Sequence, residues 1–378
     1  MIPQVALGEI TSEISRPVVL QPGVPYRSVG VKWYGAGVHV HETREGHLFE
    51  ADRFRIEQDD LIYNDMWARM GSVAIVPPNL TGSVASSHFP TFRLDGSKVI
   101  PAYLAWYFRT PSFWGDCENA SRGSTGRNQI KRSTFAAIRV PLPSLTEQRR
   151  IVARIEELAA RVEEARSLRD QTSHAIVALV ASVHAAVATS PPKPLSEYLE
   201  LHEEAVPVEI GIPYPQVGVR GFGGGLFAKP PVHGGETTYR VFNRLYQGAL
   251  VMSQVKGWEG AVAVTPKELE GYFVSPEYRT FRCKADVALT QYLAALVPTE
   301  FFWKRLKEAT RGVGARRERT RPEQFLQLEF SMPLLSDQRR AVALFASINS
   351  VRALQDETAA EIDAMVPAIL DRAFKGGL

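Results

Sequence analysis

The sequence predicts an α+β (mixed α/β) fold with two globular domains in tandem duplication, separated by two long antiparallel coiled-coil helices in a pseudo-two-fold arrangement. Three observations lead to this prediction. The chain repeats itself after 188 to 190 residues, each copy begins with short β-branched segments between turn residues, and each copy ends in a long segment of helical periodicity. We place the domains at residues 1–143 and 190–333 and the helices at 144–189 and 334–378.

The internal repeat holds its register over almost the whole chain. Glycine, aromatic and polar positions recur together, and the matched pairs include Gly30 and Gly218, Gly71 and Gly260, Tyr103 and Tyr292, and Gln148 and Gln338. Solenoid repeats are roughly 20 to 50 residues long, so a repeat of this length is a domain with its own core. A duplicated scaffold without shared chemistry would explain the apolar and glycine positions, but it leaves recurring basic segments unexplained.

Each globular part is predicted to mix short strands with one short helix. Ser72 to Val76 and its counterpart Val262 to Val264 are rich in β-branched residues and lie between turn signals. Pro101 to Phe108 is an amphipathic helix that begins with proline, where the missing N–H costs least.

Each long helix follows the globular part directly. Thr146 with Glu147 is expected to cap the first helix, and Ser336 with Asp337 the second. The first helix would be roughly 60 Å long at 1.5 Å per residue. Prolines in the segment Ser190 to Pro194 end it.

Apolar residues in both helices alternate at spacings of four and three, which is the pattern of a coiled-coil seam. The seam positions are Ile151, Ile155, Leu158, Val162, Ala165, Ile176, Leu179 and Val183 in the first helix, and Leu344, Ile348, Val351, Ile362, Met365 and Ile369 in the second. Polar residues interrupt both seams midway, and we expect Arg169 and Thr172 to meet Gln355 and Thr358 and set the register. In an alternative arrangement, each apolar stripe packs against its own domain.

Composition limits the class of protein. With 45% hydrophobic and 22% charged residues, the chain is expected to be soluble. Cys117 and Cys283 cannot form a disulfide framework or a zinc site by themselves, and the first residues do not resemble a signal peptide. The apolar run Ala175 to Ala188 is too short to cross a bilayer. We therefore expect a cytoplasmic bacterial or archaeal protein without a membrane partner.

Two basic segments recur at the same place in both copies, although the net charge is only +3. The first runs from Arg122 to Arg132 without an acidic residue, and the second runs from Lys304 to Arg321. Because Arg and Lys supply both phosphate and base contacts, DNA binding is a candidate function, whereas a solvated basic face is the alternative. The candidate residues are Arg122, Arg127, Lys131 and Arg132 in the first copy, and Arg311, Arg316, Arg317 and Arg319 in the second.

A second candidate segment differs between the copies while its flanks agree. Trp67 and Arg69 occupy it in the first copy, and Lys256 and Trp258 occupy it in the second. Two readers of different base sequences should diverge at such a position, although an unconstrained exposed loop would diverge as well.

Motifs of catalysis are absent from the sequence. It has no P-loop, no Asn/Asp-Pro-Pro-aromatic tetrapeptide and no glycine-rich S-adenosylmethionine turn. Gly218 to Gly225 precedes no helical segment, so we interpret its glycines as turn residues. His39, His41 and His47 have no equivalents in the second copy and are interpreted as surface residues. The sequence therefore predicts no active site, no metal site and no cofactor bound by this chain.

The order of domain, Pro-x-Pro-x-Leu, Glu-Gln and long helix, given twice, resembles the specificity subunit of type I restriction-modification systems. The sharpest elements are VPLPSLTEQRRI within Arg139 to Ile151 and the preceding Ser121 to Thr134, which is similar to the family's Gly-Ser-Thr loop. Asp60 to Val76 resembles the family's pattern of strand, variable loop, glycine and strand. The second copy departs at Asp337, Ser331 and Gly312 to Ala315.

This resemblance implies two target recognition domains, each reading half of a bipartite, asymmetric site in double-stranded DNA. It implies helices that set the spacing and bind two methyltransferase (modification) subunits, which use S-adenosylmethionine to methylate adenine at N6. Restriction (motor) subunits with ATP and Mg²⁺ would complete a phage-defence complex. Two alternatives remain at this point. One is a coiled-coil adaptor whose domains bind peptide or polysaccharide, and the other is the specificity subunit of a methylation-only system.

Overall fold

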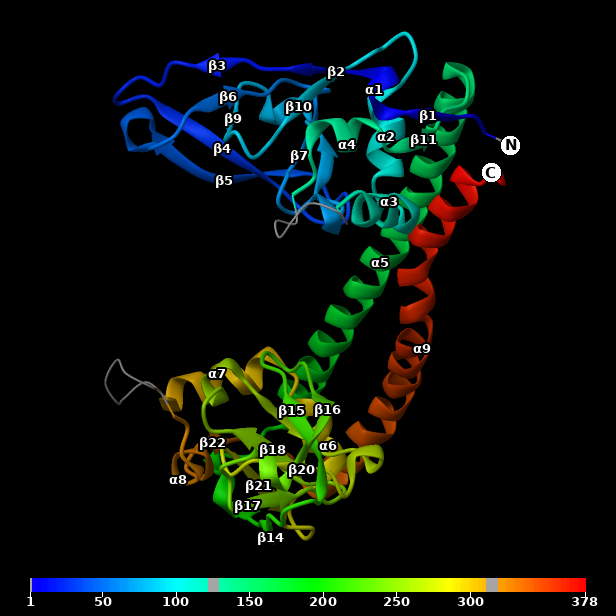
Figure 1. The fold of residues 1–378 in the computed structure, drawn as a ribbon. Helices are drawn as coiled ribbons and strands as arrows, with labels where there is room; N and C mark the ends of the chain where they lie inside the picture. The colour runs from blue at the N-terminus through cyan, green and yellow to red at the C-terminus, as the bar shows by residue number, and fades with distance from the viewer. Residues whose placement is uncertain (1, 122–128, 311–318) are drawn as a thin grey trace. The chain divides into compact units, whose positions relative to one another are not determined.

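The structure is a computed structural model that describes residues 2–121, 129–310 and 319–378 (Figure 1). The chain divides into two compact units. The first unit comprises Met1–Arg166 and Ala359–Leu378, and the second comprises Ser167–Thr358. Each unit therefore contains one globular domain together with parts of both long helices, α5 (Leu145–Val187) and α9 (Leu335–Phe374).

The described part of the first domain contains three sheets. A five-stranded sheet has the order β3 (Pro17–Val18), β6 (Arg53–Arg55), β9 (Val84–Ala85), β4 (Pro25–Val31) and β5 (Val38–Glu45). A four-stranded sheet has the order β2 (Thr11–Ile14), β10 (Thr91–Leu94), β7 (Leu61–Tyr63) and β8 (Val73–Ile75), and β1 (Gln4–Ala6) pairs with β11 (Arg139–Pro141). Its short helices are α1 (Leu7–Ile10), α2 (Pro101–Tyr107), α3 (Pro111–Ser121), α4 (Arg132–Ala136) and the 3₁₀ turns η1 (Gly46–Leu48), η2 (Ala68–Met70) and η3 (Pro78–Leu80).

The second domain repeats this topology. Its five-stranded sheet has the order β14 (Glu204–Pro207), β17 (Val241–Arg244), β20 (Phe273–Val274), β15 (Pro213–Val219) and β16 (Leu226–His233). Its four-stranded sheet has the order β13 (Leu199–Leu201), β21 (Tyr278–Cys283), β18 (Leu250–Ser253) and β19 (Val262–Val264), and β12 (Lys193–Pro194) pairs with β22 (Glu329–Phe330). The short helices are α6 (Thr290–Leu296), α7 (Glu300–Thr310), α8 (Pro322–Leu326), η4 (Leu195–Glu197), η5 (Gly234–Glu236), η6 (Gly257–Glu259) and η7 (Lys267–Leu269). The predicted mixed α/β fold with duplicated domains is confirmed.

The long helices complete the hydrophobic core of each domain. In the first unit, Ile151 and Ile155 of α5 and Leu370 of α9 are buried in one cluster with the domain's aromatic residues. In the second unit, Ile176 and Val180 of α5 join Ala341, Phe345 and Ile348 of α9 in the equivalent cluster. In both units the beginning of one helix lies beside the end of the other, so the helix segments within each unit are antiparallel. The helices therefore pack both on each other and on the domains.

A buried glutamine joins each long helix to its domain. Gln148 accepts a hydrogen bond from the Ile100 N–H at 2.9 Å and donates to the carbonyls of Lys98 and Pro143. Gln338 makes the same three bonds with Leu289, Val287 and Pro333. Both side chains are fully buried. The glutamine that follows Glu147 or Asp337 therefore has a structural role, because its hydrogen bonds fix the start of each long helix.

The predicted helix caps were wrong by two residues. The Glu147 N–H donates to Ser144 Oγ at 3.3 Å, so Ser144 rather than Thr146 caps α5. The α9 helix begins at Leu335, and the Asp337 and Gln338 N–H groups donate to the Leu334 carbonyl. The glutamine contact sets both starts, because Gln148 and Gln338 reach their partners only from the first helical turn.

The seam assignment needs a correction in α9. Leu344 and Val351 are 47% and 43% exposed, whereas Phe345 is buried and contacts the Tyr292 ring of α6. In α5, Leu179 is likewise exposed and Val180 is buried. For Leu344 and Leu179, the physical reason is that these helix segments also pack on the second domain, which draws the neighbouring Phe345 and Val180 inward.

The polar interruption of the seam lies in the second unit. Gln355 of α9 donates to the Arg169 carbonyl of α5 and accepts from Ser173 Oγ, both at 3.3 Å. Thr172 and Thr358 instead donate to carbonyls of their own helices. Gln355 and Arg169 therefore meet as expected, and the two threonines do not. Within the described ranges, no helix is long and apolar enough to cross a membrane.

Candidate nucleic-acid interface

The divergent segments form equivalent turns in the two domains. Trp67 and Arg69 belong to η2 and its cap, and Lys256 and Trp258 hold the same positions at η6. Gly71 and Gly260 end these turns with positive φ angles of 63° and 69°. A Cβ atom on Gly71 would lie 2.4 Å from Trp114 of α3, and one on Gly260 would lie 2.3 Å from Trp303 of α7. The turn backbone is therefore fixed while its side chains vary.

Five of the predicted DNA-binding residues lie outside the described residues. These are Arg122, Arg127, Arg311, Arg316 and Arg317. Described residues near the end of each basic segment lie beside the divergent turns. The Ile130 N–H donates to the Asp65 carbonyl at 3.0 Å, and the Thr320 N–H donates to the Gln254 carbonyl at 2.9 Å. The structure thus brings together, in both domains, the ends of two predicted segments that are distant in sequence.

The described basic residues of these segments remain accessible. Lys131 is exposed and, with Asp65 and Tyr63, lines a cavity of about 360 Å³. Arg132 forms an ion pair with Glu13, and Arg319 forms one with Glu277 at 3.0 Å. Exposed ion pairs contribute only about 0 to 1 kcal/mol, so a DNA phosphate can displace either carboxylate at little cost. Burial raises the pKa of the Tyr63 hydroxyl, which therefore stays neutral beside this cavity.

Sequence reasoning missed the tip of the β4–β5 hairpin as part of this surface. Tyr34 has a φ of 58° and its N–H donates to the Met70 carbonyl, while the Gly35 N–H donates to Gly71, both at 2.9 Å. The second domain repeats the arrangement, because Phe222 has a φ of 54° and donates to the Glu259 carbonyl. The interpretation of Gly218 to Gly225 as turn residues is correct for Arg220 to Gly225, which join β15 to β16, but Gly218 lies within strand β15 and pairs with Phe227.

Aromatic and basic side chains gather on the first domain where the hairpin tip meets η2. The ring centroids of Trp33 and Trp67 are 5.4 Å apart, and the Arg69 guanidinium lies 5.8 Å from the Trp67 ring. Arg109, at the end of α2, stacks on Trp106 at 4.6 Å. In the second domain, Lys256 instead lies 3.7 Å from Glu259. The two domains therefore present different chemistry on one backbone frame.

No set of metal-binding side chains was found in residues 2–121, 129–310 and 319–378. His39 and His41 lie on the edge strand β5, and His47 is in η1. Cys117 is buried, which raises its thiol pKa and keeps it protonated.

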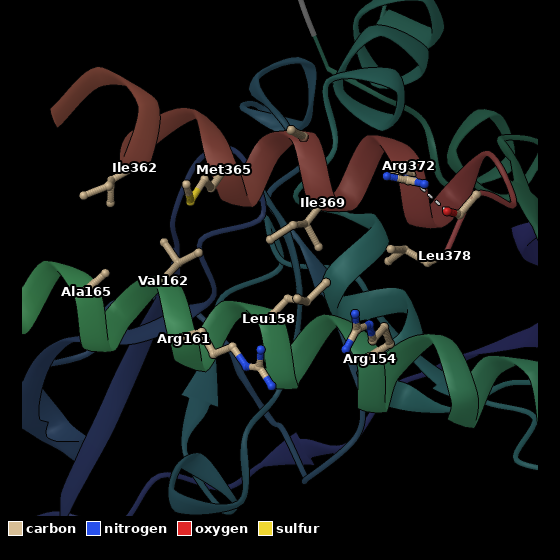
Figure 2. Close-up of a pocket in the computed structure, with 12 residues that line it drawn as sticks. Arg154, Leu158, Arg161, Val162, Ala165, Ile362, Met365, Ile369, Arg372 and Leu378 are labelled. Carbon is tan, nitrogen blue, oxygen red and sulfur yellow. Dashed lines mark hydrogen bonds between the residues drawn. The ribbon is translucent and has the colours of Figure 1, made fainter. Parts of the chain in front are cut away.

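The first unit also contains an apolar groove between its two helix segments, with a volume of about 720 Å³. Leu158 and Val162 of α5 point toward Met365 and Ile369 of α9 across this groove (Figure 2). Its lining also includes Arg154, Arg161 and Arg372. Because the facing side chains do not fill the space, this part of the helix pair offers an apolar surface edged by arginines.

Residues 15–169 match the family model described as the type I restriction modification DNA specificity domain. No curated protein matches the chain.

Solved structures resemble it along its whole length. The HsdS subunit from Thermoanaerobacter tengcongensis is 21% identical, with a TM-score of 0.50 over 100% of this chain and 97% of the other. A chain from a study of complex assembly and conformational transition of the type I R-M system is also 21% identical, with a TM-score of 0.66 over 100% of both chains. The resemblance indicated by the repeated domain and helix order is confirmed.

Proposed function

Because this chain carries the type I restriction-modification DNA specificity domain in residues 15–169 and has the fold of a specificity subunit throughout, we propose that its two domains read the two halves of a bipartite, asymmetric DNA site. One observation carries this proposal. In both domains the end of a basic segment is hydrogen-bonded beside a turn whose backbone is constant and whose side chains differ. A constant frame positions the readers, and the variable side chains select the bases.

The proposed division of labour follows from the chemistry of DNA. Lysine and arginine of the basic segments bind phosphates, which supplies affinity without sequence preference. In this proposal, Trp67 and Arg69 contact bases from the first domain, and Lys256 and Trp258 contact bases from the second. Arginine and lysine both form their best base contacts with guanine. Because the cation lies inside η2 as Arg69 but at the N-cap of η6 as Lys256, the two turns are expected to prefer different sequences.

We propose that the helices bind two methyltransferase subunits, and that the apolar groove of the first unit is part of one binding surface. Leu158, Val162 and Met365 supply apolar area there, while Arg372 supplies charge at its edge, beside the ion pair of Arg154 with Glu157. S-adenosylmethionine, ATP and Mg²⁺ would bind the partner subunits, which would also methylate adenine at N6 and cleave DNA. This chain would contribute recognition and no catalytic group.

Mapping methylated adenines tests the proposal. Cells that express this chain with its methyltransferase should acquire one methylated motif with two defined halves and an undefined spacer. Cells with the methyltransferase alone should lack that motif. An unchanged methylation pattern would contradict DNA recognition and favour an adaptor role. Methylation without restriction of incoming phage DNA would instead indicate a methylation-only system.

A further inference from the structure

The first domain carries an exposed tryptophan pair that the duplicated domain lacks. Trp33 and Trp67 are 46% and 40% exposed, and their ring planes are tilted by 38°. The equivalent positions of the second domain hold Gly221 and Lys256. Since the second domain builds the same hairpin tip and turn without these rings, folding does not require them. Large aromatic groups kept at a surface are typical of an interaction site.

The surroundings of the tryptophan pair are basic. Lys32 is exposed beside Trp33 in the chain, Arg69 lies against Trp67, and Arg109 follows the α2 helix on which the hairpin tip packs. Among the residues that the structure describes, none of these three cations has a carboxylate within ion-pairing distance. Aromatic rings next to unpaired cations are the combination that binds nucleic-acid bases and their phosphates.

The position of the pair relates it to the proposed DNA surface. Asp65, two residues before Trp67, accepts the hydrogen bond from Ile130 at the end of the first basic segment. A base inside an intact duplex is covered on both faces by its neighbours, so only an unstacked base can lie on an exposed ring. We infer that the tryptophan pair is a stacking platform for one unstacked base in the half-site read by the first domain. This inference rests on the proposed function.

The geometry restricts how the base is held. A base sandwiched between two rings needs them about 6.8 Å apart, twice the spacing of stacked bases. The two centroids are only 5.4 Å apart, so the base stacks on an outer face of the pair. Lys32, exposed beside Trp33, then neutralises a phosphate that flanks it. The second domain, with Lys256 in place of Trp67, reads its half-site without this step.

Binding to duplexes of the recognised motif tests the platform. The full chain, assembled with its methyltransferase, is titrated with matched duplexes and with duplexes mismatched at one position at a time. An unpaired base costs less to unstack, so a mismatch at one position of one half-site should tighten wild-type binding. The W33A/W67A chain should lose this gain and bind the matched duplex about tenfold or more weakly. Tyr239→Ala removes a 40% exposed ring from the second domain beyond the far end of β16, outside the proposed interface, and this control should keep both properties.

The outcomes separate the two proposals. A wild-type complex that does not distinguish the motif from a scrambled duplex would contradict the proposed function. If the complex is selective and W33A/W67A behaves like wild type, only the platform is wrong. A second measurement tests the platform even if the alanine variant does not fold. The emission of Trp33 and Trp67 is obtained by subtracting the tryptophan fluorescence of the W33F/W67F chain from that of the wild-type chain. The motif duplex should quench this emission, and unquenched emission would contradict stacking.

Discussion

The two units bury equivalent tyrosines in different ways. In the first unit, Tyr103 donates to the Pro141 carbonyl at 2.9 Å, and its ring packs edge-on against Phe374 of α9. In the second unit, the Tyr292 hydroxyl oxygen lies 2.7 Å from Nδ1 of His184 in α5. His184 occupies the position in the repeat that Phe374 holds in the first unit. Duplication thus preserved the frame and let one core contact become polar. Two units with the same backbone fold can therefore differ in how their stability depends on pH.

Substitution of the buried glutamines tests a contact that both units share, and it should give the largest loss of stability among the predictions. Gln148→Ala or Gln338→Ala leaves a buried N–H and two carbonyls without partners and opens a cavity, which should cost about 2 to 4 kcal/mol of unfolding free energy. Urea denaturation of each variant measures this loss. Gln171→Ala, on an exposed face of α5, is the control and should change little. A loss well below 1 kcal/mol at either site would contradict a shared structural role.

Substitution of His184 tests the polar contact that only the second unit has. Burial lowers the pKa of His184 to about 4, below its usual 6.5, so the unfolded chain binds the proton more tightly. The stability contributed by neutral His184 is complete above pH 6.5 and is lost as the pH falls toward 4, by about 2 kcal/mol at pH 5. His184→Phe, which copies the first unit, should remove this part of the pH dependence. Denaturation at pH 7.5 and pH 5 measures it, and an unchanged pH slope would contradict the assignment.

The basic segments should give a smaller effect per residue. Arg316, Arg317 and Arg319 replaced together by alanine should weaken DNA binding and reduce the slope of log affinity against log salt by about 0.9 for each lost phosphate contact. Arg132→Ala should act in the same direction at the first domain. Affinity measured from 50 to 200 mM salt checks both variants, and unchanged salt slopes would remove these residues from the interface.

Helix length offers a further test that concerns the spacer alone. Adding two turns to both α5 and α9 should lengthen the unspecified spacer of the methylated motif while both half-sites stay the same. Methylome sequencing reads both properties. Altered half-sites with an unchanged spacer would contradict the proposal that the helices set the spacing.

Much of the fold could be predicted from the sequence because the repeat and the helical periodicity depend on spacing alone. The limit of this prediction is visible at one position of α9, where the heptad pattern placed Leu344 in the seam but the structure buries Phe345. Gln148 and Gln338 define a shift of 190 residues, and the same shift carries the buried Ile155 onto Phe345. The repeat therefore contained the correct register. The heptad pattern did not, because it ignores packing of the helix on its own domain.

The candidate site was less predictable. Trp67 and Arg69 were identified because the copies diverge there, but Trp33 was missed because β4 and β5 gave no sign that their tip contacts η2. That contact depends on the positive φ of Tyr34 and on backbone hydrogen bonds to Met70 and Gly71. The substitution of Trp33 by Gly221 in the repeat was the available signal.

The central claim is that two domains with one frame read different half-sites, and a change confined to one turn tests it most directly. Lys256→Ala combined with Trp258→Ala alters only the divergent turn of the second domain. Methylome sequencing of cells that express this variant with the methyltransferase should show relaxed or altered bases in one half of the motif and an unchanged other half. A change in both halves, or in neither, would contradict the claim.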